Sequence, residues 1–209
     1  MRLECFAASR PQQGRAEKDN EDAFLISLED PAFAALCDGV GNPHRVAKKV
    51  LQAFQKLCRA STQHHIADPS TWTAWVRALD SGIEKEYFST FAAVVILDTV
   101  AVGACAGNSR VFLVTREGDC RHITQGADRN TLGSGKAVPF PIRQPLQLGD
   151  TLLLLTDGAW APLSLDLMKQ IVSAEAPRHF FDVPKACLEV AARNGRTDDM
   201  TAIALRLVR

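Results

Sequence analysis

The sequence lacks any net charge, because its 24 basic residues balance its 24 acidic residues. Attraction to nucleic acid or to an anionic membrane by a global field is therefore not expected, and any anion must be bound by locally placed charges. A long hydrophobic run is missing as well. The most apolar window, residues 91–107, is interrupted by Asp98 and Thr99, so it predicts two strands and not a membrane span.

Paired cysteine motifs are also absent. The six cysteines are widely scattered, and no two of them form a C-x-x-C pair. This spacing argues against zinc and redox motifs and fits a reducing compartment. The first residues contain no long apolar segment of the kind found in signal peptides. We therefore expect a cytoplasmic protein, and 209 residues that are 46% hydrophobic suit a single compact domain spanning residues 1–209.

Acidic residues are present where predicted strands begin or end. An apolar run at residues 33–37 stops at Asp38-Gly39, and another at residues 151–156 stops at Asp157-Gly158. Such runs are long enough for buried strands and too short for typical helices. Glycine after the first carboxylate lets its own main-chain carbonyl approach an ion closely. The alternative is an ordinary turn in which Asp38 caps the helix that follows.

Two of these carboxylates are expected to meet. Strands predicted at residues 23–28 and 33–37 are joined by a turn, so Asp22 at the start of one faces Asp38 at the end of the other. Like charges gathered in this way repel one another and raise one another's pKa unless a cation neutralises them. Carboxylate and carbonyl oxygens without histidine or cysteine suit Mg²⁺ or Mn²⁺, and two such ions can activate water against a phosphoryl group.

The remaining pattern predicts an α+β layered domain, because antiparallel runs of strands alternate with paired helices. Further strands are predicted at residues 2–9, 91–97, 100–105, 110–115, 120–124 and 200–208. Helices are predicted at residues 43–59, from residue 69, and at residues 164–174 and 178–193, whereas residues 125–144 are predicted to be irregular.

Four segments resemble the successive motifs of the metal-dependent protein phosphatases of type 2C. They read NEDA, DGVG, LLLTDGAW and TDDMTAI, and they occupy residues 20–23, 38–41, 153–160 and 197–203. Their order and separation match that family across nearly the whole chain. The resemblance implies a four-layer α-β-β-α sandwich, in which two antiparallel sheets are flanked by helices on both outer faces.

The resemblance also implies hydrolysis of phosphoserine and phosphothreonine on proteins by water held between two Mn²⁺ or Mg²⁺ ions. Asp38 and Asp157 would be the catalytic residues, with Asp38 bridging both ions. The full set of implied metal ligands is Glu21, Asp22, Asp38, the Gly39 carbonyl, Asp157 and Asp198. A phosphoprotein is the implied partner, and we expect a monomer with no nucleic-acid or membrane partner.

Departures from the family pattern affect the residues that are expected to bind the substrate phosphate and a third metal ion. Glu17 stands where the family often places an arginine, so Arg15 or Lys18 is expected to hold the substrate phosphate. Asn108 replaces an aspartate that helps to bind a third metal in many bacterial members, so that site is expected to be weak or absent. Val40 replaces a histidine that, in animal members, is thought to protonate the leaving group. A metal-bound water is expected to fill this role instead.

Other readings stay open at this point. The same fold can serve as a non-catalytic module that binds a phosphoprotein, or as a hydrolase of small phosphate esters such as nucleotides. Residues 133–136 read GSGK, but they fail the phosphate-binding loop pattern because Asn130 and Ala137 stand where glycine and Ser or Thr are required. Asp199 is either a buried acceptor behind the ligands or a solvated residue.

Overall fold

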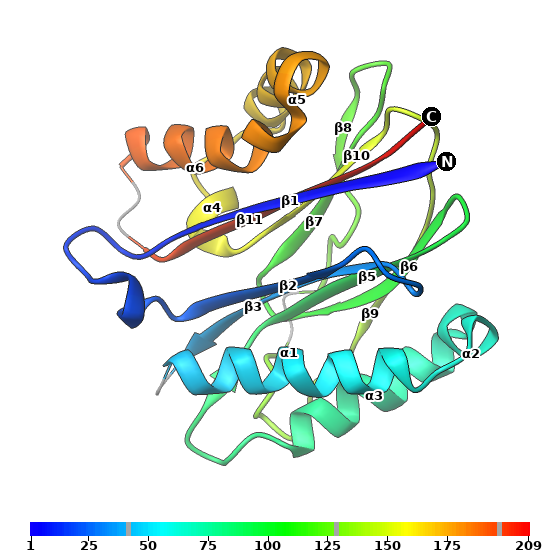
Figure 1. Ribbon diagram of the computed structural model, residues 1–209. Helices are drawn as coiled ribbons and strands as arrows, with labels where there is room; N and C mark the ends of the chain where they lie inside the picture. Colours follow the sequence, from blue (N-terminus) through cyan, green and yellow to red (C-terminus); the bar gives the residue numbers. More distant parts are fainter. Residues whose placement is uncertain (41–42, 128–129, 196–197) are drawn as a thin grey trace.

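The computed structural model describes residues 1–40, 43–127, 130–195 and 198–209, which form two stacked antiparallel sheets between two layers of helices (Figure 1). Within these ranges, none of the helices combines the length and the hydrophobicity that crossing a bilayer requires. The α+β layering predicted from the residues and the four-layer α-β-β-α sandwich implied by the family resemblance are both confirmed.

Each sheet is built from strands that are distant in sequence. The first sheet has the order β1 (Arg2–Arg10), β11 (Met200–Val208), β10 (Thr151–Leu155), β7 (Arg110–Val114) and β8 (Cys120–His122). The second sheet has the order β2 (Asp22–Ser27), β3 (Phe33–Val40), β5 (Phe91–Leu97), β6 (Val100–Ala106) and β9 (Phe140–Pro145). A short strand, β4 (Phe88–Ser89), pairs with the end of β3.

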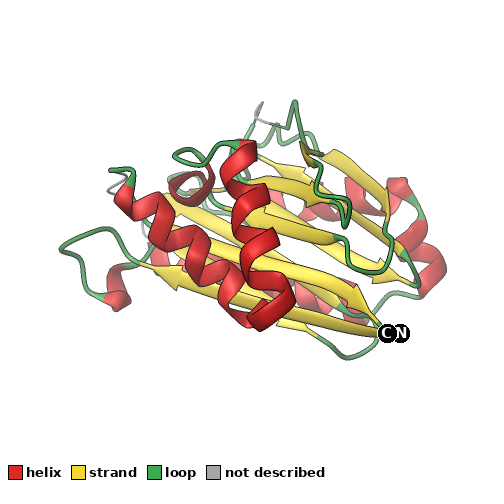
Figure 2. Cartoon of the chain, turned by 90° about the horizontal axis from the view of Figure 1, so that it is seen from above, coloured by secondary structure: helices red, strands yellow, loops and turns green. Residues whose placement is uncertain are grey.

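The helices cover the outer faces of both sheets, as Figure 2 shows from above. The second sheet is covered by α1 (Pro43–Arg59), α2 (Gln63–Ala67) and α3 (Pro69–Ser81). The first sheet is covered by α5 (Leu165–His179) and α6 (Val183–Arg193). A single turn of helix, α4 (Asp157–Trp160), follows β10, and short 3₁₀ turns occupy Glu17–Asp19 and Phe180–Asp182.

Burial on both faces explains the unbroken apolar strands. In β10, Leu152 and Leu154 pack between the two sheets, whereas Leu153 and Leu155 pack against the layer of α5 and α6. A strand covered on both sides needs hydrophobic residues at every position, so it does not alternate. Under α1, Phe54 meets four aromatic rings, with centroids 5.3–6.0 Å away. This rigid core fixes the strand ends that carry the acidic residues.

The structure corrects the prediction for residues 125–144. Phe140–Pro145 is not irregular but forms β9, which pairs with β6 at the edge of the second sheet. Proline is tolerated in such an edge strand because one side of the strand needs no hydrogen bond from it, so Pro141 does not exclude a strand there. The short elements α2 and β4 were also not predicted, and α5 extends to His179, beyond the predicted end at residue 174.

Candidate metal centre

The β2–β3 hairpin brings two carboxylates together at one end of the sandwich. Asp22 and Asp38 are direct partners in its antiparallel register. The backbone of Asp38 is held from the other side by Thr90, whose hydroxyl accepts the Asp38 N–H at 2.8 Å and whose N–H donates to the Asp38 carbonyl at 2.8 Å. Because both main-chain groups are satisfied, the Asp38 side chain projects from a rigid strand end.

Asp22 also links the two sheets. The Thr156 hydroxyl, at the end of β10, donates to Asp22 Oδ2 at 2.8 Å and accepts the Thr201 N–H at 2.8 Å. The other carboxylate oxygen, Asp22 Oδ1, is buried and has no hydrogen-bond partner among the described residues. A buried carboxylate oxygen without a donor is costly, and a divalent cation is one way to satisfy it.

The acidic residues act on one another electrostatically. Burial, and after it the neighbouring charges of Asp22, Asp157 and Asp198, together raise the pKa of Asp38 to about 9. Burial likewise raises the pKa of Asp22 to about 7, against the hydrogen bonds from Thr156 and Thr201. Carboxylates from both sheets therefore repel one another at this end of the molecule, which is the environment that a hard cation relieves.

These described acidic side chains are gathered at one end of the sandwich but are not arranged as a complete metal site. Among the residues that the structure describes, no group of three His, Cys, Asp or Glu side chains lies in the arrangement of a metal site. The donor set nevertheless fits Mg²⁺ or Mn²⁺, because it consists of oxygens and includes the orphaned Oδ1 of Asp22.

Asn108 is a neighbour of Asp157 and not an additional carboxylate. Its side-chain Nδ2 donates to Asp157 Oδ2 at 3.2 Å, and its main-chain carbonyl accepts from Trp160 Nε1 at 2.8 Å. The Arg110 guanidinium lies 3.4 Å from the centroid of the Trp160 ring. At this position the chain therefore orients Asp157 with an amide instead of adding negative charge.

Asp199 is a buried acceptor, which settles the alternative left open by the sequence. Its carboxylate, in a residue only 5% exposed, accepts the N–H groups of Gln12 at 2.5 Å and of Glu21 at 2.6 Å. Its own N–H donates to Asp198 Oδ1 at 3.0 Å. The side chain thus ties together both ends of the loop between β1 and β2, beside the exposed Asp198.

Gly158 packs against the same residue. A Cβ atom at Gly158 would lie 1.9 Å from the carbonyl oxygen of Asp199, so only glycine fits at this position without backbone movement. The glycine of the Asp157-Gly158 motif therefore sets the spacing between the turn after β10 and the start of β11. Gly41 and Thr197, which belong to two of the motifs, lie outside the described residues.

The two candidates for phosphate binding differ in placement. Arg15 Nη1 lies 3.9 Å from Glu21 Oε1, so its side chain is directed toward the acidic end of the sandwich. Lys18 is exposed on the 3₁₀ turn Glu17–Asp19 and forms no ion pair with a described residue. Of the two candidates, Arg15 is therefore the one that lies beside a proposed metal ligand.

Replacing Asp199 by asparagine is expected to loosen the loop between β1 and β2. Asparagine has one acceptor oxygen, so either the Gln12 or the Glu21 N–H loses its partner, at a cost of about 1–3 kcal/mol. Hydrogen exchange at the amide that loses its partner is expected to accelerate at least tenfold. Asp19→Asn, an exposed change in the same loop, is the control, and unaltered exchange in Asp199→Asn would show that the carboxylate does not hold the loop.

The pKa shifts predict an unusual pH dependence for the metal-free protein. The folded-state pKa of Asp38, about 9, lies above its ordinary value of 3.8, so the folded chain binds more protons than the unfolded chain between these values. Stability measured in a chelator is therefore expected to fall as the pH rises from 5 to 9. Asp38→Asn should flatten this pH dependence, whereas the exposed change Asp119→Asn should not. A wild-type stability that rises from pH 5 to 9 would contradict the clustering of carboxyl groups around Asp38.

Solved structures resemble this chain over its full length, although no protein-family model and no curated protein matches it. The Mycobacterium tuberculosis serine/threonine phosphatase PstP/Ppp has a TM-score of 0.85 at 20% identity, with 100% of each chain covered. The catalytic domain of PstP in complex with two manganese ions has a TM-score of 0.82 at 21% identity, with 99% of each chain covered. PppA of Pseudomonas aeruginosa has a TM-score of 0.77 at 18% identity, covering 99% of this chain and 98% of PppA.

At these identities the likeness shows the fold. The chain has the α-β-β-α fold of these bacterial serine/threonine phosphatases, as its resemblance to the type 2C enzymes predicted.

Proposed function

We propose that this chain is a metal-dependent serine/threonine protein phosphatase, which hydrolyses phosphoserine and phosphothreonine by a water held between two Mn²⁺ or Mg²⁺ ions. The observation that carries the proposal is the convergence of carboxylates from both sheets. Asp22 and Asp38 are register partners in the second sheet, and Thr156, which directly precedes Asp157 at the end of β10, donates to Asp22 Oδ2. Burial and the charges of Asp22, Asp157 and Asp198 hold the pKa of Asp38 at about 9. A purely structural turn has no need to maintain such an environment.

Each proposed ligand would have its own role. Asp38 would bridge both ions and, with Asp157, act directly in catalysis. The other proposed ligands are Glu21, Asp22, the Gly39 carbonyl and Asp198. When bound, the ions would act as Lewis acids and lower the pKa of the attacking water. The protein's own part is to orient these oxygens, through Thr156 at Asp22 and through Asn108 at Asp157.

Arg15 is proposed as the residue that holds the substrate phosphate. A guanidinium can bind two phosphate oxygens at once, and this one already lies beside Glu21. Lys18 is the alternative, and it would contribute a single point charge from the exposed turn Glu17–Asp19. Glu17, in the place of the arginine common in the family, is the feature that instead favours a non-catalytic phosphoprotein-binding module.

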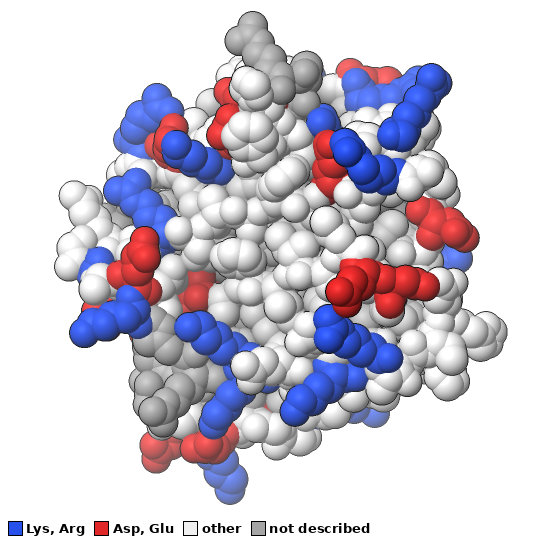
Figure 3. Space-filling model, in the orientation of Figure 1, with Lys and Arg blue, Asp and Glu red and all other residues white. Residues whose placement is uncertain are grey.

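The proposed partner is a phosphoprotein. The chain itself is proposed to be a monomeric, cytoplasmic protein of one domain. The net charge is zero, and on the face drawn in Figure 3 basic and acidic side chains are interspersed around an uncharged middle. Among the described residues on this face, the charged side chains form no extended basic track for nucleic acid. Recognition of an anionic substrate would therefore rest on the bound ions and on Arg15.

Comparing substrates tests the proposal and its alternatives together. With Mn²⁺, phosphate release from a phosphothreonine peptide is expected to exceed release from a nucleotide at equal concentration at least tenfold. Arg15→Gln should raise the KM for the peptide about tenfold with little change in kcat, because it removes binding to the phosphate and not the metal chemistry. Lys18→Gln is the matched control.

Other outcomes would redirect the assignment. Faster release from the nucleotide would identify a hydrolase of small phosphate esters. Phosphopeptide binding without release would identify the non-catalytic module. An unchanged KM in Arg15→Gln together with a raised KM in Lys18→Gln would move the phosphate contact to the lysine.

A further inference from the structure

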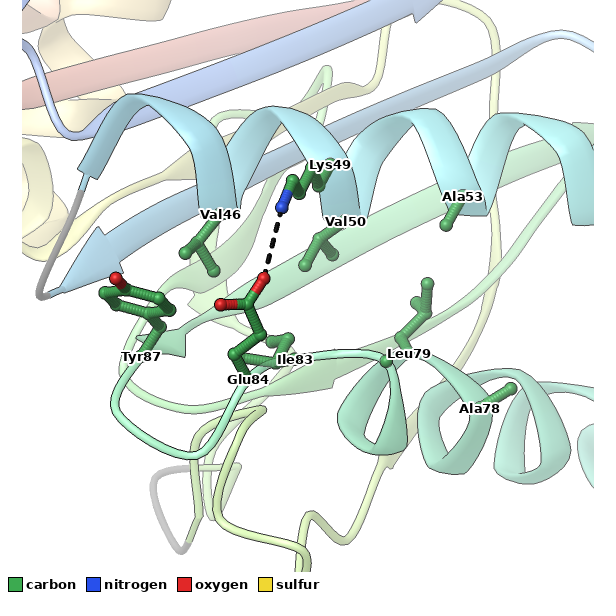
Figure 4. A pocket seen from close by; sticks show the side chains of 10 residues that line it. Val46, Lys49, Val50, Ala53, Ala78, Leu79, Ile83, Glu84 and Tyr87 are labelled. Carbon is green, nitrogen blue, oxygen red and sulfur yellow. Dashed lines mark hydrogen bonds and ion pairs between the residues drawn. The ribbon is translucent and has the colours of Figure 1, made fainter.

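A second concave site lies between α1 and the end of α3, on the outer helical layer. It has a volume of about 160 Å³, and none of its lining residues is a proposed metal ligand. From α1 it is lined by Val46, Lys49, Val50 and Ala53; from the end of α3 and the segment that follows it, by Ala78, Leu79, Gly82, Ile83, Glu84 and Tyr87 (Figure 4). The site is thus separate from the carboxylate cluster.

The walls of this pocket are apolar and firmly packed. Val46, Val50 and Leu79 are buried members of the core beneath α1, and Ile83 and Tyr87 pack against the same core. A dry cavity of about 150 Å³ is large enough to bind benzene, so this one accommodates a single large aliphatic or aromatic side chain. Two small residues, Ala53 and Ala78, leave its outer side open to solvent.

One hydrogen-bond donor and one acceptor stand side by side at the rim. Lys49 Nζ lies 3.5 Å from Glu84 Oε1, and the two side chains are 65% and 71% exposed. In Figure 4 this ion pair crosses the pocket between α1 and the segment after α3. An ion pair so exposed contributes little to stability, so a ligand can separate its two members at low cost.

We propose that this pocket is a docking site for a peptide segment of a partner protein, which inserts one large apolar side chain. The chemistry of the rim selects this occupant. A peptide offers adjacent N–H and C=O groups, which match the Glu84 acceptor and the Lys49 donor. A small carboxylic acid would satisfy Lys49 alone and leave Glu84 facing a second negative charge. A buried apolar anchor within a polar rim is the usual form of a binding hot spot.

The pocket adjoins the strand that carries Asp38. Tyr87, in the wall, directly precedes β4, and Ser89 of β4 pairs with Gly39 while its hydroxyl donates to the Asp38 carbonyl at 3.2 Å. A docked partner would therefore be held at a fixed distance from the carboxylate cluster. Binding at this pocket does not depend on the proposed phosphatase activity, so the two ideas can fail separately.

Titration of the isotope-labelled full chain with blocked phenylalanine amide, followed by amide chemical shifts, tests the proposal. Shifts are expected at Val46, Leu79, Ile83 and Tyr87, and none with blocked glycine amide. Ala53→Phe should fill the pocket and weaken binding at least fivefold. Ala174→Phe, the same change at an exposed position on α5, is the matched control.

The rim is tested by Lys49→Ala and Glu84→Ala, each of which should weaken binding about threefold, as expected for an exposed hydrogen bond. These exposed changes also serve if Ala53→Phe fails to fold. Absent or scattered shifts, or unchanged binding by the Lys49→Ala, Glu84→Ala double variant, would overturn the proposal. Tighter binding of phenylacetate than of the amide would overturn it as well, since the pocket would then take a small acid.

Discussion

Replacing Asp38 by alanine is expected to lower manganese-dependent hydrolysis of p-nitrophenyl phosphate by about a thousandfold. Asp38 is the proposed bridge between the two ions, so its removal should disrupt both sites at once. The small substrate makes the assay independent of protein recognition and of Arg15. Asp38 also lies at a strand end where Thr90 hydrogen-bonds to both its main-chain N–H and its main-chain carbonyl. The fold should therefore survive the change.

Two controls separate chemistry from folding. Asp119→Ala removes an exposed acidic residue from the turn before β8 and should leave the rate unchanged. Asp38→Asn keeps the shape of the side chain but lowers its negative charge, and it should be nearly as damaging as alanine. Equal rates in wild type and Asp38→Ala would refute the catalytic assignment, leaving the fold and the docking pocket standing.

Gly158→Ala is expected to destabilise the protein by about 3 kcal/mol and to lower its affinity for Mn²⁺ at least tenfold. The new Cβ would lie 1.9 Å from the Asp199 carbonyl oxygen, so the turn carrying Asp157 must move away from the start of β11. That movement separates Asp157 from Asp198, which are proposed to share an ion. Calorimetry with Mn²⁺ and denaturant unfolding measure the two effects.

Gly103→Ala is the matched control, because its Cβ would lie 2.0 Å from the Ala93 carbonyl oxygen inside the second sheet. It should cost similar stability, yet a folded fraction should bind Mn²⁺ normally. Comparable loss of metal affinity in both variants would show that the effect of Gly158→Ala is general destabilisation. Normal Mn²⁺ binding by Gly158→Ala would show that the spacing of the two turns does not matter.

The sequence predicts the fold well, because its strongest signals are local. The turn at Asp30-Pro31 defines the β2–β3 hairpin, in which Asp22 and Asp38 lie opposite each other. The apolar run of β10 indicates a strand buried on both faces. Such short-range patterns define strand ends, and strand ends are where the acidic residues stand. The edge strand β9 was missed because its two prolines resemble loop residues until a neighbouring strand is known.

Contacts between distant segments could not be predicted in the same way. Asp199 contacts Gln12 and Glu21 across more than 170 residues of sequence, and the Thr156 hydroxyl contacts Asp22 across 134. No local pattern distinguishes such an acceptor from a solvated acidic residue. The pocket between α1 and α3 depends on the packing of two helices and on their small residues, which periodicity alone does not specify.

Anomalous scattering from crystals soaked in Mn²⁺ tests the central claim most directly. The account predicts two ions at the end of the sandwich, both contacted by Asp38. One is also contacted by Asp157 and Asp198, and the other by Glu21, Asp22 and the Gly39 carbonyl. A map without manganese at this position, or with Asp157 or Asp198 out of reach of an ion bound to Asp38, would contradict it.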